Sequence, residues 1–224
     1  MDKSGLSKKS ALESVAGSLP TEIGSTLLAA FSGTPVAALL PILTGTLANK
    51  RHRERVELAL TGISAELEKQ KEALANITDA QYKLINEAIL ATLQATDEDK
   101  LQYLRNVLSN AIHDDHIAPQ KADFLSRVIR DMSAKEAQFL IRNSHYERIL
   151  ILSNRVGEQS REQLSDKTFI ANIAAQDGIA ATGLISLGLL IPSEPTYENT
   201  GSHRWAAIVE QLVTLLIPPQ SPSS

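Results

Sequence analysis

Two amphipathic helices are encoded by residues 78–112, TDAQYKLINEAILATLQATDEDKLQYLRNVLSNAI. Thr78 is followed three residues later by Gln81, which is the capping-box pattern of a helix N-terminus. Asp97 precedes a second, acidic first turn, which the helix dipole favours. Leu and Ile then recur at helical spacing in both segments. The stretch therefore predicts two helices joined by a short connection.

The flanking sequence continues the same pattern. Residues 51–74 form a charged amphipathic segment, and Pro119 stands where it can open a helix. Ser133 and Glu136 make a second capping box. Because helix-favouring residues dominate the composition, we expect a mainly α protein with a multi-helix bundle over residues 51–143.

The character of the sequence changes after residue 143, and residues 144–217 predict a small α+β module. Residues 149–152, ILIL, suit either a strand or a buried helical turn. The elements expected after them are a helix over 166–175, a helix over 179–187, a strand ending near Pro192, a strand around Tyr197 and a helix over 205–217. This order is winged-helix-like. Residues 218–224 predict a disordered tail.

Composition argues against several classes of protein. The 224 residues include no cysteine, so neither a thiolate metal site nor a cysteine nucleophile exists. Residues 163–202 carry one basic residue, Lys167, against four acidic ones, and the net charge is −4. This balance disfavours nucleic acid. No nucleophile elbow or phosphate-binding loop is present. We therefore expect no enzyme activity, no cofactor and no small-molecule substrate.

An uncharged stretch of 27 residues, 23–49, dominates the N-terminal segment 1–50 and leads into Lys50-Arg51-His52-Arg53. Pro35 divides it into two apolar pieces, each too short to cross a hydrocarbon core of about 30 Å alone. Basic residues flank it on both sides, and positive charges favour the cytoplasmic side. Two interpretations stay open. The stretch is either a hairpin that inserts into the membrane from the cytoplasmic side or a hairpin buried in a soluble bundle.

The membrane reading assigns specific contacts. Lys50, Arg51 and Arg53 would hold anionic lipid headgroups, each contributing about 1 kcal/mol near the surface. The side chains that would contact lipid are Leu27, Leu28, Phe31, Val36, Leu39, Leu40 and Leu43. The protein would then be cytoplasmic and peripheral at the inner face of the cell membrane.

A short cluster, His113-Asp114-Asp115-His116, is the one group with metal-ligand chemistry. Imidazole and carboxylate suit Zn or Mn. His113, Asp114 and His116 would have to share a helix face, however, and Pro119 indicates that the helix is ending. The favoured interpretation is a polar helix terminus with no metal.

The middle and the end of the chain resemble the bacterial abortive-infection alpha family over about half of the length. The residues that carry the resemblance are Leu101, Leu104-Arg105-Asn106-Val107-Leu108, Pro119, Phe124-Leu125, Val128-Ile129, Met132 to Ala137, Leu184, Leu187 to Leu190, Tyr197 and Thr200-Gly201. The resemblance implies phage defence in which the infected cell stops growing. It assigns no catalytic residues. Our hypothesis is a non-enzymatic defence protein that associates with or permeabilises the membrane. The alternative is a soluble interaction or scaffold protein with a protein partner or a homo-oligomeric state.

Overall fold

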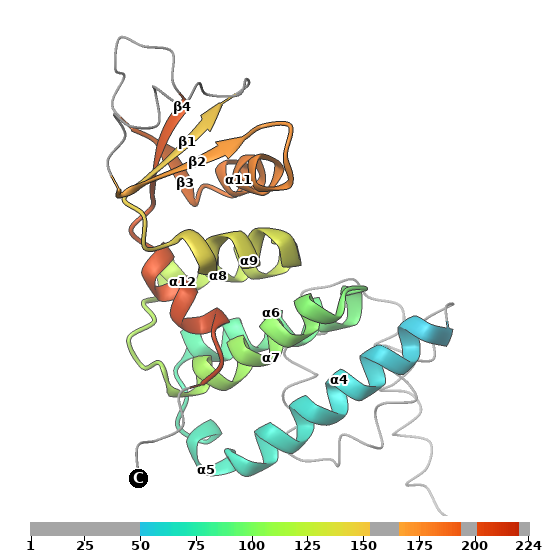
Figure 1. Cartoon of the computed structure of the whole chain (residues 1–224). Helices are drawn as coiled ribbons and strands as arrows, with labels where there is room; N and C mark the ends of the chain where they lie inside the picture. The colour runs from blue at the N-terminus through green and yellow to red at the C-terminus, as the bar shows by residue number, and fades with distance from the viewer. Residues whose placement is uncertain (1–49, 153–165, 194–200, 220–224) are drawn as a thin grey trace, which may run out of the picture.

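The structure, a computed structural model, describes residues 50–152, 166–193 and 201–219 (Figure 1). The helices are α4 (Lys50–Lys69), α5 (Lys71–Leu74), α6 (Asp79–Gln94), α7 (Glu98–His113), α8 (Pro119–Asp131), α9 (Ala134–Asn143), α11 (Gln176–Ser186) and α12 (Val209–Leu216). The strands are β1 (Arg148–Leu152), β2 (Thr168–Asn172), β3 (Leu190–Pro192) and β4 (Gly201–Trp205). The protein is mainly α, with a helical bundle and a small C-terminal α+β module, as the sequence predicts.

Three predicted helix starts in the bundle are confirmed, those capped by Thr78, Asp97 and Ser133. Thr78 Oγ1 accepts from the Gln81 N–H at 3.3 Å, and Gln81 Oε1 accepts from the Thr78 N–H at 2.8 Å. Ser133 and Glu136 form the same reciprocal pair at α9, and the Asp97 side chain caps α7. These bonds satisfy N–H groups that have no partner inside the helix, so each helix begins where its capping residue stands.

Helices α6, α7 and α8 form the centre of the bundle, and α4 packs across α6 and α7. Gln81 Nε2 donates to the carbonyl oxygens of Ala111 and Ile112, each at 3.0 Å. These bonds join the first turn of α6 to the last turn of α7, so the two helices are antiparallel. On the other side of α6, Arg130 of α8 forms an ion pair of 3.2 Å with Glu87.

The sheet is mixed, with the strand order β2-β1-β4-β3. Strand β1 pairs with β2 in parallel and with β4 in the antiparallel sense, and β3 and β4 form an antiparallel pair. Helix α11 packs on β2, β3 and β1, and on α9. Helix α11 leads into the antiparallel β3–β4 pair, and the module is a small α+β unit built on this mixed sheet.

One predicted helix is wrong. Residues 168–172, within the helix expected over 166–175, form β2, which pairs along its full length with β1. Thr, Phe and Ile favour a pleated, half-buried surface, and β1 supplies the neighbour that makes a strand the better state. The open choice for residues 149–152 is settled by the same pairing: they lie in β1. The strand expected around Tyr197 lies outside the described residues.

The last helix begins at Val209 and not at the predicted Trp205, because Trp205 is the final residue of β4. Helix α12 returns from the sheet to the bundle and packs on α7. Asn106 Nδ2 donates to the Leu216 carbonyl at 2.7 Å. Asn110 Nδ2 reaches three neighbouring carbonyl oxygens at 2.8 and 3.0 Å. The two amides therefore satisfy carbonyl groups that the end of α12 leaves without intrahelical partners.

In the described part of the chain, nearly all buried apolar side chains belong to one cluster that extends from α4 to α12. Side chains on both sides of the predicted boundary between residues 143 and 144 belong to it. Phe139 of α9 is 1% exposed and lies at this junction. Its ring centroid is 5.6 Å from that of Phe169 and 6.4 Å from that of Trp205. The bundle and the sheet are thus packed against each other through aromatic side chains.

Candidate functional sites

The N-terminal end of α4 is the first candidate site. Its first turn contains no acidic residue, and Lys50 and Arg51 are exposed. Lys50 Nζ lies 3.8 Å from Glu54 Oε1, a pair whose side chains are largely exposed. Figure 1 shows this end of α4 at the periphery of the bundle. Because cations at a helix N-terminus oppose the helix dipole, they stand here at an electrostatic cost.

The two arginines that follow, Arg53 and Arg55, are less exposed than Lys50 and Arg51. Arg55 Nη1 donates to the Thr96 carbonyl at 2.7 Å, which ties α4 to the connection between α6 and α7. Arg53 is half-buried. Of the three predicted headgroup-binding residues, Lys50 and Arg51 are therefore the ones whose side chains are exposed to solvent.

The predicted lipid-contacting side chains, Leu27 to Leu43, lie outside the described residues. Within the described parts of the chain, no helix combines the length and apolarity needed to cross a membrane. The contact of residues 23–49 with a membrane therefore stays a prediction.

Residues 113–116 form the end of α7 and the turn that follows it. Asp114 is the C-cap residue of α7; its Oδ1 accepts from the His116 N–H at 3.1 Å, and its Oδ2 accepts from Gln211 Nε2 at 3.0 Å. His113 and His116 are exposed, and His116 Nδ1 lies 3.3 Å from Asp115 Oδ1. Across residues 50–152, 166–193 and 201–219, no three His, Asp or Glu side chains gather closely enough to hold a metal ion. Asp114 thus ends α7 and contacts α12.

A half-buried lysine lies between α7 and α8. Lys100 Nζ donates to the Arg130 carbonyl at 2.7 Å. Burial lowers the pKa of Lys100, and the nearby Asp131 and Glu136 oppose that shift. Burial also raises the pKa of the neighbouring Tyr103. The cavity beside these residues, about 10 Å³, is too small for a ligand, so Lys100 serves to bind a carbonyl at the end of α8.

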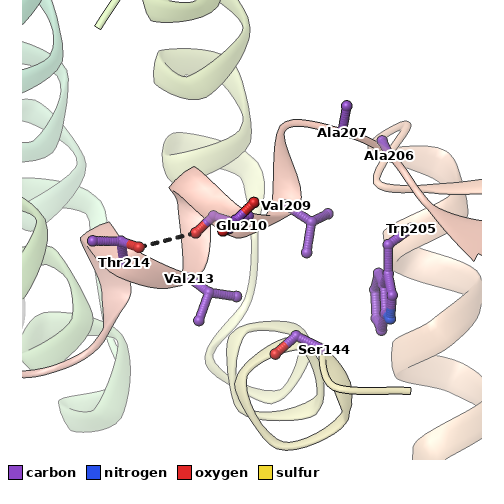
Figure 2. A pocket seen from close by; sticks show the side chains of 8 residues that line it. All are labelled: Ser144, Trp205, Ala206, Ala207, Val209, Glu210, Val213 and Thr214. Atoms are coloured by element: carbon purple, nitrogen blue, oxygen red, sulfur yellow. Dashed lines mark hydrogen bonds between the residues drawn. The ribbon is translucent and has the colours of Figure 1, made fainter. Parts of the chain in front are cut away.

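A groove beside Trp205 is the second candidate site, with a volume of about 430 Å³. Figure 2 shows Val209 and Val213 of α12, one turn apart, together with Ser144 after α9 and the indole of Trp205. The lining residues are Ser144, Trp205, Ala206, Ala207, Val209, Glu210, Val213 and Thr214. Its lining is mixed, because the apolar side chains lie beside Ser144, Thr214 and the carboxylate of Glu210. Such a groove suits an apolar side chain of a protein partner.

Sequence reasoning did not find this groove. Its residues come from two segments separated by about 60 positions, and only folding brings Ser144 to Trp205. The one usable signal was the single tryptophan of the chain, followed by Val209 and Val213 at helical spacing.

Comparison of the chain with protein families, with curated proteins and with solved structures finds no match. Neither a family nor a solved fold therefore assigns a function. The resemblance to the abortive-infection alpha family stays a prediction from the residues that carry it.

Proposed function

We propose that this protein is a non-enzymatic bacterial phage-defence protein of the abortive-infection alpha type that acts at the inner face of the cell membrane. Residues 23–49 contact lipid. Lys50 and Arg51 bind anionic headgroups, and the half-buried Arg53 adds a third positive charge. The observation that carries the proposal is the exposed cation pair at the start of α4, directly after 27 uncharged residues. The defence role comes from the family resemblance.

The physical case rests on where the positive charge is placed. A helix N-terminus already carries partial positive charge, so adding Lys50 and Arg51 there costs folding free energy. The same concentration of charge favours phosphate groups, because the N–H dipoles and the two cations act on an anion together. Each basic residue close to an anionic surface contributes about 1 kcal/mol to binding. A charge arrangement that opposes helix stability is thus favourable at a lipid surface.

Neutralising this pair should weaken membrane binding. We expect K50Q/R51Q to bind vesicles of phosphatidylcholine and phosphatidylglycerol roughly 30-fold more weakly than the wild type, since about 2 kcal/mol of attraction is lost. The measurement is vesicle flotation across a lipid titration, with leakage of an enclosed dye as a second readout. The matched control is K69Q/K71Q, which removes the same charge from exposed lysines at the other end of α4 and beyond it.

Two further readouts make the experiment decisive. Thermal unfolding of K50Q/R51Q should match or slightly exceed that of the wild type, because an unfavourable dipole interaction is relieved. Equal weakening by K69Q/K71Q would mean that net charge, and not the start of α4, attracts the lipid. A wild-type protein that neither floats with the vesicles nor releases dye would end the membrane proposal.

The defence role is tested in cells. A bacterial host that expresses the wild-type chain should form fewer phage plaques than the empty host, and infected cultures should stop growing instead of lysing. Expression of K50Q/R51Q should restore plaque numbers, whereas K69Q/K71Q should protect like the wild type. If K50Q/R51Q still protects the host, defence does not depend on membrane binding through Lys50 and Arg51. If the wild-type chain protects against no phage of a panel, the defence role is wrong.

The groove beside Trp205 favours a second candidate function, that of a soluble interaction protein. In that case residues 23–49 belong to the core or to an oligomer interface. Deletion of residues 23–49 distinguishes the two functions. The membrane function predicts a variant that still unfolds cooperatively on heating but no longer binds vesicles. The soluble function predicts a variant that loses cooperative unfolding.

A further inference from the structure

The groove beside Trp205 combines an aromatic ring with a negative charge that has no partner. Glu210 is exposed, and in the described part of the chain no ion pair includes its carboxylate. Among the residues that line the groove, none is a lysine or an arginine. The groove therefore carries one negative charge that no cation of its lining neutralises.

The ring of Trp205 supplies the aromatic surface. Its centroid lies 6.4 Å from that of Phe139, so the ring is packed against the core. The indole N–H is buried and meets no hydrogen-bond partner among the described residues, so it is not open to a ligand in the groove. The ring therefore offers the groove carbon atoms and their π electrons, which attract a cation.

Helix α12 supplies the apolar part of the groove. Val209 and Val213 stand one turn apart on this helix, and both line the space shown in Figure 2. The volume of the groove, about 430 Å³, falls within the range of about 300–1,000 Å³ that is usual for ligand pockets. The groove thus offers an apolar side chain and a cation adjacent places.

We propose that the groove binds an arginine side chain of a partner protein, together with an apolar side chain of the same segment. The guanidinium group lies over Trp205 and pairs with Glu210, and the apolar neighbour packs on α12. Arginine suits this site better than lysine, because its planar, weakly hydrated head group stacks on aromatic rings and binds a carboxylate through two N–H groups. Acidic segments are disfavoured because like charges would meet at Glu210.

This inference rests on the interaction function that the groove favours, and it names the chemistry of the partner. It does not require membrane contact, because none of residues 23–53 lines the groove. Variant K50Q/R51Q should therefore bind an arginine peptide like the wild type. Variant E210Q should bind vesicles like the wild type.

The first experiment uses the single tryptophan of the chain, whose emission reports directly on the groove. The probes are acetyl-Leu-Ala-Arg-Leu-amide and its versions with citrulline or glutamate in place of arginine. Citrulline keeps the shape of arginine without its charge. We expect the arginine peptide at millimolar concentration to change the emission of Trp205 and to bind roughly fivefold more tightly than the citrulline peptide. High salt should reduce this difference, because salt screens exposed charges.

The second experiment neutralises the carboxylate. Glu210 lies in the first turn of α12, where the helix dipole favours a negative charge, so E210Q also removes a helix-stabilising interaction. The matched control is E98Q, which removes an exposed carboxylate from the first turn of α7, outside the groove. We expect E210Q to weaken binding of the arginine peptide roughly fivefold and E98Q to leave it unchanged.

The exposed Ala207 at the groove allows a charge to be added without changing a residue of α12. A207K should weaken binding of the arginine peptide, and A207E should strengthen it, each by roughly threefold. Neither substitution should change binding of the citrulline peptide, because that peptide carries no charge.

Several results would overturn the proposal. If the arginine and citrulline peptides bind equally, the groove takes an apolar side chain only, and the interaction function stands without the cation. If no peptide changes the emission of Trp205, the groove binds no such segment, and the interaction function loses its support as well. If E98Q weakens binding as much as E210Q, or the glutamate peptide binds most tightly, Glu210 does not hold a cation in the groove.

Discussion

Replacing Phe139 with alanine is expected to lower the free energy of unfolding by about 3–5 kcal/mol, the usual cost of removing a buried phenylalanine ring. Phe139 is 1% exposed and lies on α9 between the bundle and the sheet. Its ring meets Phe169 nearly edge-on, at an interplanar angle of 79°. Loss of the ring removes this aromatic contact and leaves a cavity at the junction, where packed elements on both sides resist collapse.

The measurement is urea unfolding followed by tryptophan fluorescence, because Trp205 is the only tryptophan and its ring centroid lies 6.4 Å from that of Phe139. F139L keeps most of the apolar volume and should lose only about 1 kcal/mol. L58A changes a side chain that is 75% exposed and should alter stability by less than about 0.5 kcal/mol. If F139A lowers the free energy of unfolding as little as L58A does, Phe139 is not part of the core shared by the bundle and the sheet.

Replacing Gly178 with alanine is expected to destabilise the protein by about 3 kcal/mol, at the high end for an overpacked site. A Cβ at this position would stand 2.0 Å from the Asn172 carbonyl oxygen and 2.4 Å from the Ile173 Cα. Both atoms belong to the backbone at the end of β2, so neither can rotate away. Helix α11 would have to move off the strand, and its contacts with the sheet would be lost.

Two other glycines serve as matched controls. A Cβ at Gly183 would meet the tip of the Glu136 side chain at 1.7 Å, which can move at the expense of its capping bond, so G183A should cost about 1 kcal/mol. A Cβ at Gly62 would meet only the Arg105 guanidinium at 2.9 Å, and G62A should gain up to about 1 kcal/mol of helix propensity. Thermal melting should therefore rank G62A above G183A and G183A above G178A. The reverse order would contradict the close approach of α11 to β2.

How much of the candidate sites could be predicted depended on how local they are. Lys50 and Arg51 follow directly after the uncharged stretch, so their proximity to it is a property of the chain itself. The groove beside Trp205 is different. It exists only because segments about 60 positions apart pack together, and no spacing along the sequence records that contact.

The sequence by itself determined where the bundle helices begin. Thr78, Asp97 and Ser133 each cap the N–H group three residues further on, and so short a range needs no tertiary contact. Only the tertiary structure decided that residues 168–172 form a strand, because a strand is stable only when another strand pairs with it. It likewise decided that Asn106 binds the Leu216 carbonyl, 110 positions away. A capping bond forms within one turn of backbone, whereas a strand pair and an interhelical amide bond need partners that only the folded chain brings together.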